Sequence, residues 1–398
     1  MSTMEELPVA RKCPFAPPEE YTATREEAPV HRVKIPDGKQ AWTVSRHEDV
    51  RAVLNDPRFS ADRLHPDFPT LVPGGNVIRR TEAERTMLAM DAPQHGPERK
   101  AVLGEFTVKR VAELKPRIQE IVDGLIDDIL EADGPVDLVE KLALPVPSLV
   151  ICEMLGVPYE DHDFFQENTK QLINRATNAE DRRAAFERVQ AYMGELIAKK
   201  EADPGDDLIS RQIAKRREDG TYDRAKLVSL AFLLLAAGHE TTANMISLGT
   251  VAFLRNPEQL ALIKADPAKT LTAVEELLRY FSIVDNATRM AKEDVEIGGV
   301  TIPAGDGVVV MTYAANWDPE VFEDSSAFDI ERGARHHVAF GFGPHQCLGQ
   351  NLARTELQIV FDTLFRRIPT LKLAKDVDDL PFKDDALIYG LYELPVTR

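Results

Sequence analysis

One cysteine near the C-terminal end of the chain lies among residues suited to metal chemistry. Cys347 lies in the glycine-rich stretch 340–349, directly before an amphipathic run whose apolar residues recur at helical spacing. The thiol should therefore lie at the start of a helix, where free N–H groups and the helix dipole lower its pKa. Because the thiolate is the form that binds metal, we interpret Cys347 as a candidate metal ligand. Gly343 suits a turn with positive φ, and Gly349 suits the approach of a large flat group that packs on Phe340.

A long apolar run carries a second set of reactive residues. Residues 224–255 predict a buried helix of roughly 45 Å, and polar side chains interrupt it at Glu240 and Thr241. Thr241 can hydrogen-bond the carbonyl of Ala237 one turn earlier, and Gly238 removes bulk at the same place. The result would be a small groove with an alcohol and a carboxylate beside it, suited to holding dioxygen and relaying protons. The alternative is a core threonine and a carboxylate with a structural partner.

Two potential hydrogen-bond donors lie shortly before the first long helical region. His95 and Arg99 are four residues apart, so they share a face if a helix begins there. They could direct two donors at carboxylates, or they could be two solvated polar residues.

These stretches occur in the order in which the cytochrome P450 family carries its motifs. The chain resembles that family of haem-thiolate monooxygenases in residues 91–99, 237–242, 276–279, 328–332 and 340–349, and so along nearly its whole length. The resemblance implies one mainly α-helical domain over residues 1–398, with a long central helix over haem and a small β-sheet region. It also implies a folding role for Glu276 and Arg279, which should form a buried cluster with Arg332.

The resemblance assigns roles to the candidate residues. Cys347 would be the axial iron ligand of haem b, Glu240 the acid and Thr241 the catalytic alcohol. The residues implied to contact the cofactor are His95, Arg99, Ala237, Gly238, Arg289, Phe340, Gly343, His345, Cys347 and Gly349. Among these, His95, Arg99, Arg289 and His345 would bind the two propionates. Simple solvent exposure is the alternative for Arg289.

Composition narrows the possible partners. The chain has 398 residues, is 43% hydrophobic and carries a net charge of −18. Such a charge disfavours binding to nucleic acid or to anionic membranes. The most apolar run, residues 227–238, is shorter than the ~20 residues that span a bilayer. With an odd cysteine count and no apolar export segment, we expect a soluble, cytoplasmic protein.

Electrons must come from outside the chain, because no flavin or nicotinamide fingerprint follows a strand. The resemblance implies a ferredoxin with its reductase, O2, and a moderately large hydrophobic substrate such as a terpenoid, sterol, macrolide or polyketide-like compound. The basic residues expected to form the ferredoxin-docking face are Arg99, Lys100, Lys109, Arg110, Arg332, Arg335, His336, His337 and His345. The residues expected to line the substrate pocket are Val77, Ile78, Ala236, Ala237, Ile283, Val284, Asn286, Leu387 and Ile388.

Apolar spacing and turn residues predict the remaining elements. We predict a hairpin over residues 30–45, a short helix over 47–55, helices over 111–132, 149–155 and 163–200, and a hairpin over 369–398. Pro116 should lie in the first turn of its helix or mark a kink. Residues 59–93 form a long loop, which we interpret as a pocket wall.

Other functions remain open from the sequence. A lone cysteine is more often a small buried apolar residue. A non-catalytic haem-thiolate gas sensor or carrier would share the cofactor loop, but it needs no acid–alcohol pair. A peroxide-driven relative would replace that pair with a cation, and a helical interaction protein would bind no cofactor.

Overall fold

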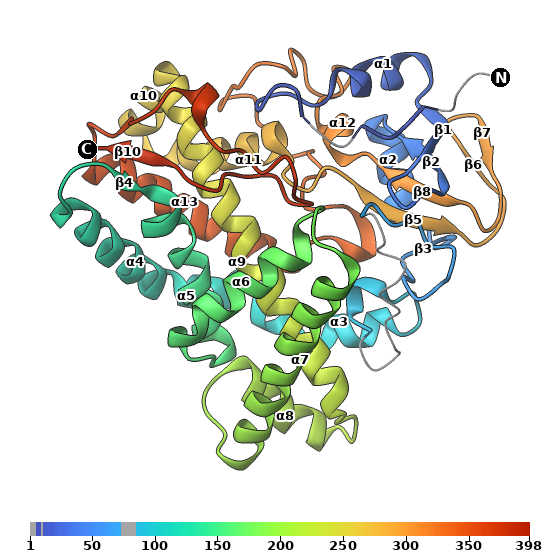
Figure 1. Ribbon diagram of the computed structural model, residues 1–398, viewed down its shortest axis with the longest axis horizontal. Helices are drawn as coiled ribbons and strands as arrows, with labels where there is room; N and C mark the ends of the chain where they lie inside the picture. The colour runs from blue at the N-terminus through green and yellow to red at the C-terminus, as the bar shows by residue number, and fades with distance from the viewer. Residues whose placement is uncertain (1–4, 9–10, 73–84) are drawn as a thin grey trace.

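The structure is a computed structural model of the chain and describes residues 5–8, 11–72 and 85–398. It is mainly α-helical, as predicted, with the helices gathered beside a smaller region of strands (Figure 1). The α-helices are α1 (Glu19–Glu27), α2 (His47–Asn55), α3 (His95–Leu103), α4 (Val108–Glu131), α5 (Pro145–Leu155), α6 (His162–Ile173), α7 (Ala179–Ala202), α8 (Leu208–Glu218), α9 (Arg224–Arg255), α10 (Pro257–Ala265), α11 (Thr270–Phe281), α12 (Thr312–Asn316) and α13 (Gln350–Arg367).

Helix α9 runs through the middle of the helical region (Figure 1). Its bounds are those predicted, because both ends carry local stop signals. The Asp223 side chain accepts a hydrogen bond from the N–H of Lys226 at the start. Asn256 and Pro257 follow its last residue. The helix packs against α5, α7 and α13, which accounts for its almost continuous burial.

Strands from distant parts of the chain meet in small sheets. The strands are β1 (Val30–Lys34), β2 (Gln40–Val44), β3 (Phe59–Ser60), β4 (Val136–Asp137), β5 (Ala287–Ala291), β6 (Val295–Ile297), β7 (Val300–Ile302), β8 (Gly307–Val310), β9 (Lys372–Leu373) and β10 (Pro395–Thr397). The largest sheet has the order β1-β2-β8-β5-β3. Val30 lies opposite Val44, which confirms the predicted hairpin. Strand β5 holds Arg289 in this sheet, opposite Val308 of β8.

The tail of the chain forms a hairpin, as predicted, but one with an additional partner. Strand β10 pairs antiparallel with β9 and also with β4, which lies far earlier in the sequence. The helical stretch 163–200 divides into α6 and α7, and the break falls at residues 174–178.

Three predictions from the sequence are wrong or stay untested in the structure. Pro116 lies well inside α4 and not in its first turn, so that alternative is wrong. The pocket-wall residues Val77 and Ile78 lie outside the described residues. The assignment of residues 1–398 to one domain stays a prediction, supported by a hydrophobic core that includes both Phe15 and Val396.

The predicted cluster around Glu276 is present, and Glu276 and Arg279 within it are fully buried. Glu276 Oε1 lies 2.7 Å from Nη2 of Arg279, and the exposed fraction of both side chains is 0%. Arg332 Nε approaches the same carboxylate at 3.2 Å. Arg279 also donates to the carbonyl oxygens of Asn316, Ser325 and Ala327. The cluster therefore ties α11 to the irregular segment that leads toward Cys347.

Candidate active site

Cys347 lies in a tight loop that ends where α13 begins. Its N–H donates to the carbonyl oxygen of Phe340 at 2.7 Å, which closes the loop. Gly343 has a φ of +71°, and a Cβ there would lie 2.9 Å from the carbonyl oxygen of Leu54. Both observations agree with the predicted need for glycine at this turn. Arg99 Nη2 donates to the Gln346 carbonyl at 2.6 Å, so α3 helps to hold the loop.

The backbone N–H of Gly349 at the helix start lowers the pKa of this thiol, as predicted, but the expected net lowering is wrong for the chain by itself. Burial among the surrounding protein atoms raises the pKa of Cys347 and outweighs the hydrogen bond from Gly349 and the charges of Arg99 and Arg354. The sulfur lies before α13 and not within its first turn, which weakens the dipole effect. The residue is nevertheless accessible to solvent. A metal bound at the sulfur would reverse the balance, because coordination deprotonates a thiol.

Four cationic or imidazole side chains gather beside the cysteine loop. They are His95 and Arg99 of α3, Arg289 of β5 and His345 of the loop itself. The ring centroids of His95 and His345 lie 4.1 Å apart. Burial and the charges of Arg289 and His95 lower the pKa of His345 to about 3. Burial also lowers the pKa of His95 and of Arg289, and the nearby carboxylate of Asp91 opposes all three shifts.

This cluster fits an anionic cofactor that brings its own metal. Two carboxylates would relieve the repulsion among the four side chains. Within the described ranges, no group of three or more His, Cys, Asp or Glu could hold a metal ion. A cofactor could supply the further ligands of a metal at Cys347. Apart from its own chain neighbours, no described residue has an atom within 4 Å of a Cβ built on Gly349, so there is space beside the loop. An iron porphyrin with two propionates meets these conditions.

The middle of α9 is accessible, although its flanks are buried. Ala237 is exposed, and Ala236, Gly238 and Thr241 are half-buried. Thr241 Oγ1 donates to the carbonyl oxygen of Ala237 at 2.9 Å, as predicted. A Cβ on Gly238 would lie 2.8 Å from Ile151 of α5. Gly238 therefore allows α5 to pack closely on α9. The sequence suggested a different reason for glycine here, namely a groove that holds dioxygen, and that role stays a prediction.

Glu240 has a partner that the sequence did not reveal. Lys383 Nζ lies 2.5 Å from Glu240 Oε1, and both side chains are about nine-tenths buried. Asn244 Nδ2 donates to the same oxygen at 3.3 Å. Burial would raise the pKa of Glu240, but Lys383, His239 and Asn244 outweigh it and lower the pKa. No hydrogen bond joins Glu240 to Thr241 among the residues that the structure describes.

The proposed docking face is partly occupied by internal contacts. His337 is buried and lies 3.1 Å from Glu275 of α11, so its inclusion in that face is wrong. Arg332 is bound to Glu276, and Arg110 pairs with Glu113. The basic residues that remain exposed are Lys100, Lys109, Arg335 and His336.

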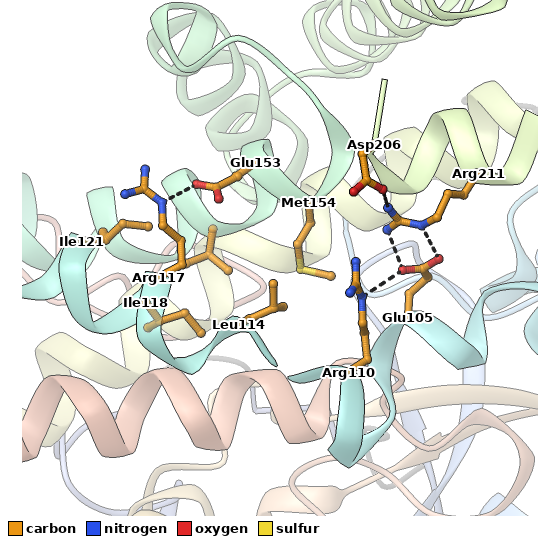
Figure 2. Close-up of a pocket in the computed structure, with 11 residues that line it drawn as sticks. Glu105, Arg110, Leu114, Arg117, Ile118, Ile121, Glu153, Met154, Asp206 and Arg211 are labelled. Carbon is orange, nitrogen blue, oxygen red and sulfur yellow. Dashed lines mark hydrogen bonds and ion pairs between the residues drawn. The ribbon is translucent and has the colours of Figure 1, made fainter. Parts of the chain in front are cut away.

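A separate surface pocket lies between α4, α5 and the start of α8 (Figure 2). Leu114, Ile118 and Met154 line it, and ion pairs that join Glu105 to Arg110 and Arg211 border it. None of the candidate active-site residues lines this pocket, so we do not connect it with the chemistry.

The accessible thiol of Cys347 and the four side chains beside it could hold a large anionic macrocycle. Comparison with known proteins agrees. The family model for cytochrome P450 matches residues 270–388. Pentalenic acid synthase of Streptomyces avermitilis is 50% identical over 398 residues, which cover 98% of this chain and 96% of that protein. The crystal structure of cytochrome P450 MoxA from Nonomuraea recticatena is 61% identical, covers 98% of both chains and gives a TM-score of 0.91.

The chain belongs to the cytochrome P450 family. It is accordingly a P450 monooxygenase, an oxidoreductase of a family that uses haem. A third neighbour, the structure of CYP105P1 in complex with filipin I, is 44% identical with a TM-score of 0.94 and covers 99% of both chains. Among the helices that the structure describes, none combines the length and apolar character needed to cross a membrane.

Proposed function

We propose that the protein is a haem b monooxygenase that takes electrons from a reduced ferredoxin and hydroxylates a moderately large hydrophobic molecule. The overall reaction is R–H + O2 + 2 e⁻ + 2 H⁺ → R–OH + H2O. The observation that carries this proposal is the gathering of His95, Arg99, Arg289 and His345 beside the accessible thiol of Cys347. That set would provide one sulfur ligand for iron and donors for two propionates.

Each part of the site has a place in this proposal. Cys347 would bind the iron, and the four donors would hold the propionates. Phe340, Gly343 and Gly349 would shape the cysteine side, with Ala237 and Gly238 on the opposite side. When bound, haem supplies the oxygen-activating chemistry. The chain itself must hold the substrate, keep bulk water away and deliver two protons.

Thr241 and Glu240 are the groups proposed to deliver those protons. Thr241 Oγ1 gives its own proton to the carbonyl of Ala237, so its oxygen can accept a hydrogen bond from water. Rotation of the hydroxyl would let it donate instead. Glu240 lies one residue earlier on α9 and its lowered pKa keeps it ionised near neutral pH. It could take protons from water and pass them on, as a general acid–base group does.

The substrate wall is supported by one long-range contact. The N–H of Tyr389 donates to the Ile283 carbonyl at 2.9 Å, which joins the two predicted segments 283–286 and 387–389. The side chain of Asn286 is half-buried, and its Nδ2 donates to Tyr21 Oη at 3.3 Å. Asn286 is proposed to orient a polar group of the substrate. Relatives of 44–50% identity are named pentalenic acid synthase, vitamin D3 dihydroxylase and 20-oxo-5-O-mycaminosyltylactone 23-monooxygenase. These names support a terpenoid, sterol, macrolide or polyketide-like substrate.

A basic surface with an apolar centre is proposed as the ferredoxin-docking site. Leu103 and Val108 are exposed at 45% and 71%. They lie in sequence between the exposed cations Lys100 and Lys109. Such a patch would attract an acidic partner and bury apolar area on contact, despite the net negative charge of the whole chain. The cytoplasm, where ferredoxins are reduced, stays the proposed location, consistent with Cys13, Cys152 and Cys347 all being free.

Two measurements test the proposal. The reduced holoprotein with CO should show the red-shifted Soret band of thiolate ligation, and Cys347→Ser should lose it. Ferredoxin, reductase and O2 should then convert a compound selected by a spin-shift screen of terpenoids, sterols, macrolides and polyketides. A haem-thiolate sensor or carrier would give the band but no product. A normal spectrum from Cys347→Ser would overturn the proposal.

A further inference from the structure

The ion pair between Glu240 and Lys383 joins the central helix to the tail of the chain. Lys383 Nζ contacts Glu240 Oε1 at 2.5 Å and Asn244 Oδ1 at 2.9 Å. Asn244 Nδ2 in turn donates to Glu240 Oε1. Within the described chain, the hydrogen bonds to this carboxylate therefore all end on Oε1. The second oxygen, Oε2, accepts no hydrogen bond from the described residues.

The tail is seated closely on α9 at this point. The N–H of Lys383 donates to the Gly390 carbonyl at 2.9 Å, so residues 383–390 form a closed turn. A Cβ on Gly390 would overlap the side chain of Asn244. Because backbone and helix meet this tightly, the Lys383 side chain has little freedom to leave Glu240.

The same segment is fastened to the connection between α6 and α7. The N–H of Leu387 donates to the Ile173 carbonyl at 2.9 Å, and the N–H of Arg175 donates to the Asp385 carbonyl at 2.6 Å. Asn174 Nδ2 donates to Asp385 Oδ2 at 2.8 Å. In Figure 1 the tail reaches the end of α6, as these bonds require. Lys383 is thus anchored from both α9 and the α6–α7 connection.

We propose that Lys383 is a positioning residue for proton delivery: it holds Oε1 of Glu240, so that Oε2 stays free to exchange protons with water at the accessible part of α9 around Thr241. This inference rests on the proposed role of Glu240 as a proton relay. Lys383 does not itself pass a proton to O2. Because the segment 383–392 is hydrogen-bonded to the α6–α7 connection, the orientation of the Glu240 carboxylate would depend on the position of that connection.

The electrostatics define what loss of Lys383 should do. Besides Lys383, the titratable groups that face Glu240 are His239 on its own helix and Tyr392 on the tail. Without the ammonium, burial would raise the pKa of Glu240, so the group would take up a proton and keep it. A carboxyl group that stays protonated cannot accept the next proton from water.

The first test follows the carboxyl group itself and needs no substrate. Infrared difference spectra of the holoenzyme, wild type against Glu240→Gln, identify the bands of Glu240. We expect an ionised carboxylate in the wild type and in Lys383→Arg, and a protonated C=O band in Lys383→Met at neutral pH. An ionised Glu240 in folded Lys383→Met would overturn the inference. Thermal melts show whether each variant folds.

The second test follows proton delivery during turnover. The substrate is the compound from the spin-shift screen that gives the highest product yield. With it, Lys383→Met should lower product per electron roughly tenfold and release hydrogen peroxide. The solvent isotope effect on turnover should also change. Lys383→Arg should restore coupling. If Lys383 acts only through Glu240, the double variant Lys383→Met/Glu240→Gln should match Glu240→Gln in its isotope effect. That double variant also removes both buried charges, so it should fold even where Lys383→Met does not.

The outcomes separate the two ideas. Full coupling in Glu240→Gln would end the proposed relay role of Glu240. Uncoupling in Glu240→Gln with normal coupling in Lys383→Met would overturn the positioning role of Lys383 alone. Equal losses in Lys383→Met and Lys383→Arg would indicate a merely structural lysine and would also overturn it.

Discussion

Glu276 and Arg279 face each other across 2.7 Å with neither side chain exposed to solvent. Arg279 has no other carboxylate partner among the described residues, and its remaining bonds go to backbone carbonyls. Removing Arg279 would leave the fully buried carboxylate of Glu276 with Arg332, at 3.2 Å, as its remaining cationic partner among the described residues. The pair therefore holds the segment that leads to the cysteine loop. Breaking it should lower the free energy of unfolding considerably.

We expect Arg279→Met to lower the free energy of unfolding by roughly 3–5 kcal/mol. The measurement is urea unfolding of the purified holoprotein. Arg117→Met is the matched control, because Arg117 pairs with Glu120 and Glu153 at the surface, where more than half of each side chain is exposed. It should cost about 1 kcal/mol or less. Equal losses in the two variants would contradict the assigned folding role.

Gly238→Ala and Gly124→Ala should change stability in opposite directions. The Cβ of Gly238→Ala meets Ile151 at 2.8 Å and should destabilise by roughly 1–3 kcal/mol. Gly124 is exposed inside α4 with nothing within 4 Å of the added Cβ, so alanine should stabilise by up to about 1 kcal/mol. Thermal unfolding of both variants checks this. An unchanged stability of Gly238→Ala would show that α5 does not pack closely on α9 at this position.

Glu356 should make the protein less stable as pH rises. Burial raises the pKa of Glu356 to about 8 against a usual value of 4.5, although a hydrogen bond from Thr242 lowers it somewhat. Between those two values the folded chain keeps a proton that the unfolded chain has lost, so stability falls as pH increases. Glu356→Gln should remove this slope between pH 5 and about 8. Urea unfolding at several pH values is the measurement, and an unchanged slope would rule out a protonated Glu356.

Thr241→Ala should keep haem and substrate binding but divert electrons to hydrogen peroxide. Thr250→Ala is a control on the same helix, since Thr250 Oγ1 also donates to the carbonyl one turn earlier, at 2.8 Å, and is fully buried. We expect product per electron to fall roughly tenfold in Thr241→Ala and to stay near wild type in Thr250→Ala. The measurement is product and peroxide formed per electron supplied by the reduced ferredoxin. Full coupling in Thr241→Ala would argue against the alcohol as a proton donor.

Reversal of charge at Arg335 should weaken ferredoxin-driven turnover. Arg335→Glu adds repulsion toward an acidic partner, and salt should reduce the difference from wild type. Lys226→Glu makes the same charge change at an exposed site on α9 and should leave the rate unchanged. Turnover is measured against ferredoxin concentration at low and high ionic strength. Equal effects of the two variants would remove Arg335 from the docking face.

Local features of the sequence were sufficient for much of the fold. The bounds of α9 and α2 and the hairpin of β1 and β2 follow from capping residues, apolar period and turn residues that lie within a few positions of each other. The glycine turn at Gly343 and the bond from Thr241 to Ala237 are local in the same sense. The predicted position of Pro116 in the first turn of its helix was wrong, because α4 begins at Val108, before the apolar pattern starts.

Other features depend on segments that meet only in the folded chain. Lys383 is 143 residues from Glu240, and nothing in the sequence near either residue indicates that they pair. The same holds for His337, which the fold buries against Glu275, and for Gly238, whose neighbour is set by the packing of α5.

The sequence by itself determined which residues could bind a metal, donate to carboxylates or carry protons, since those capacities belong to side-chain type and short spacing. Only the tertiary structure decided the state of those groups. Burial raised the pKa of Cys347 against the effect expected from the helix start, and Lys383 lowered that of Glu240 against the effect of burial. Desolvation and charge act through space, so their balance is set by which distant atoms the fold places around each group.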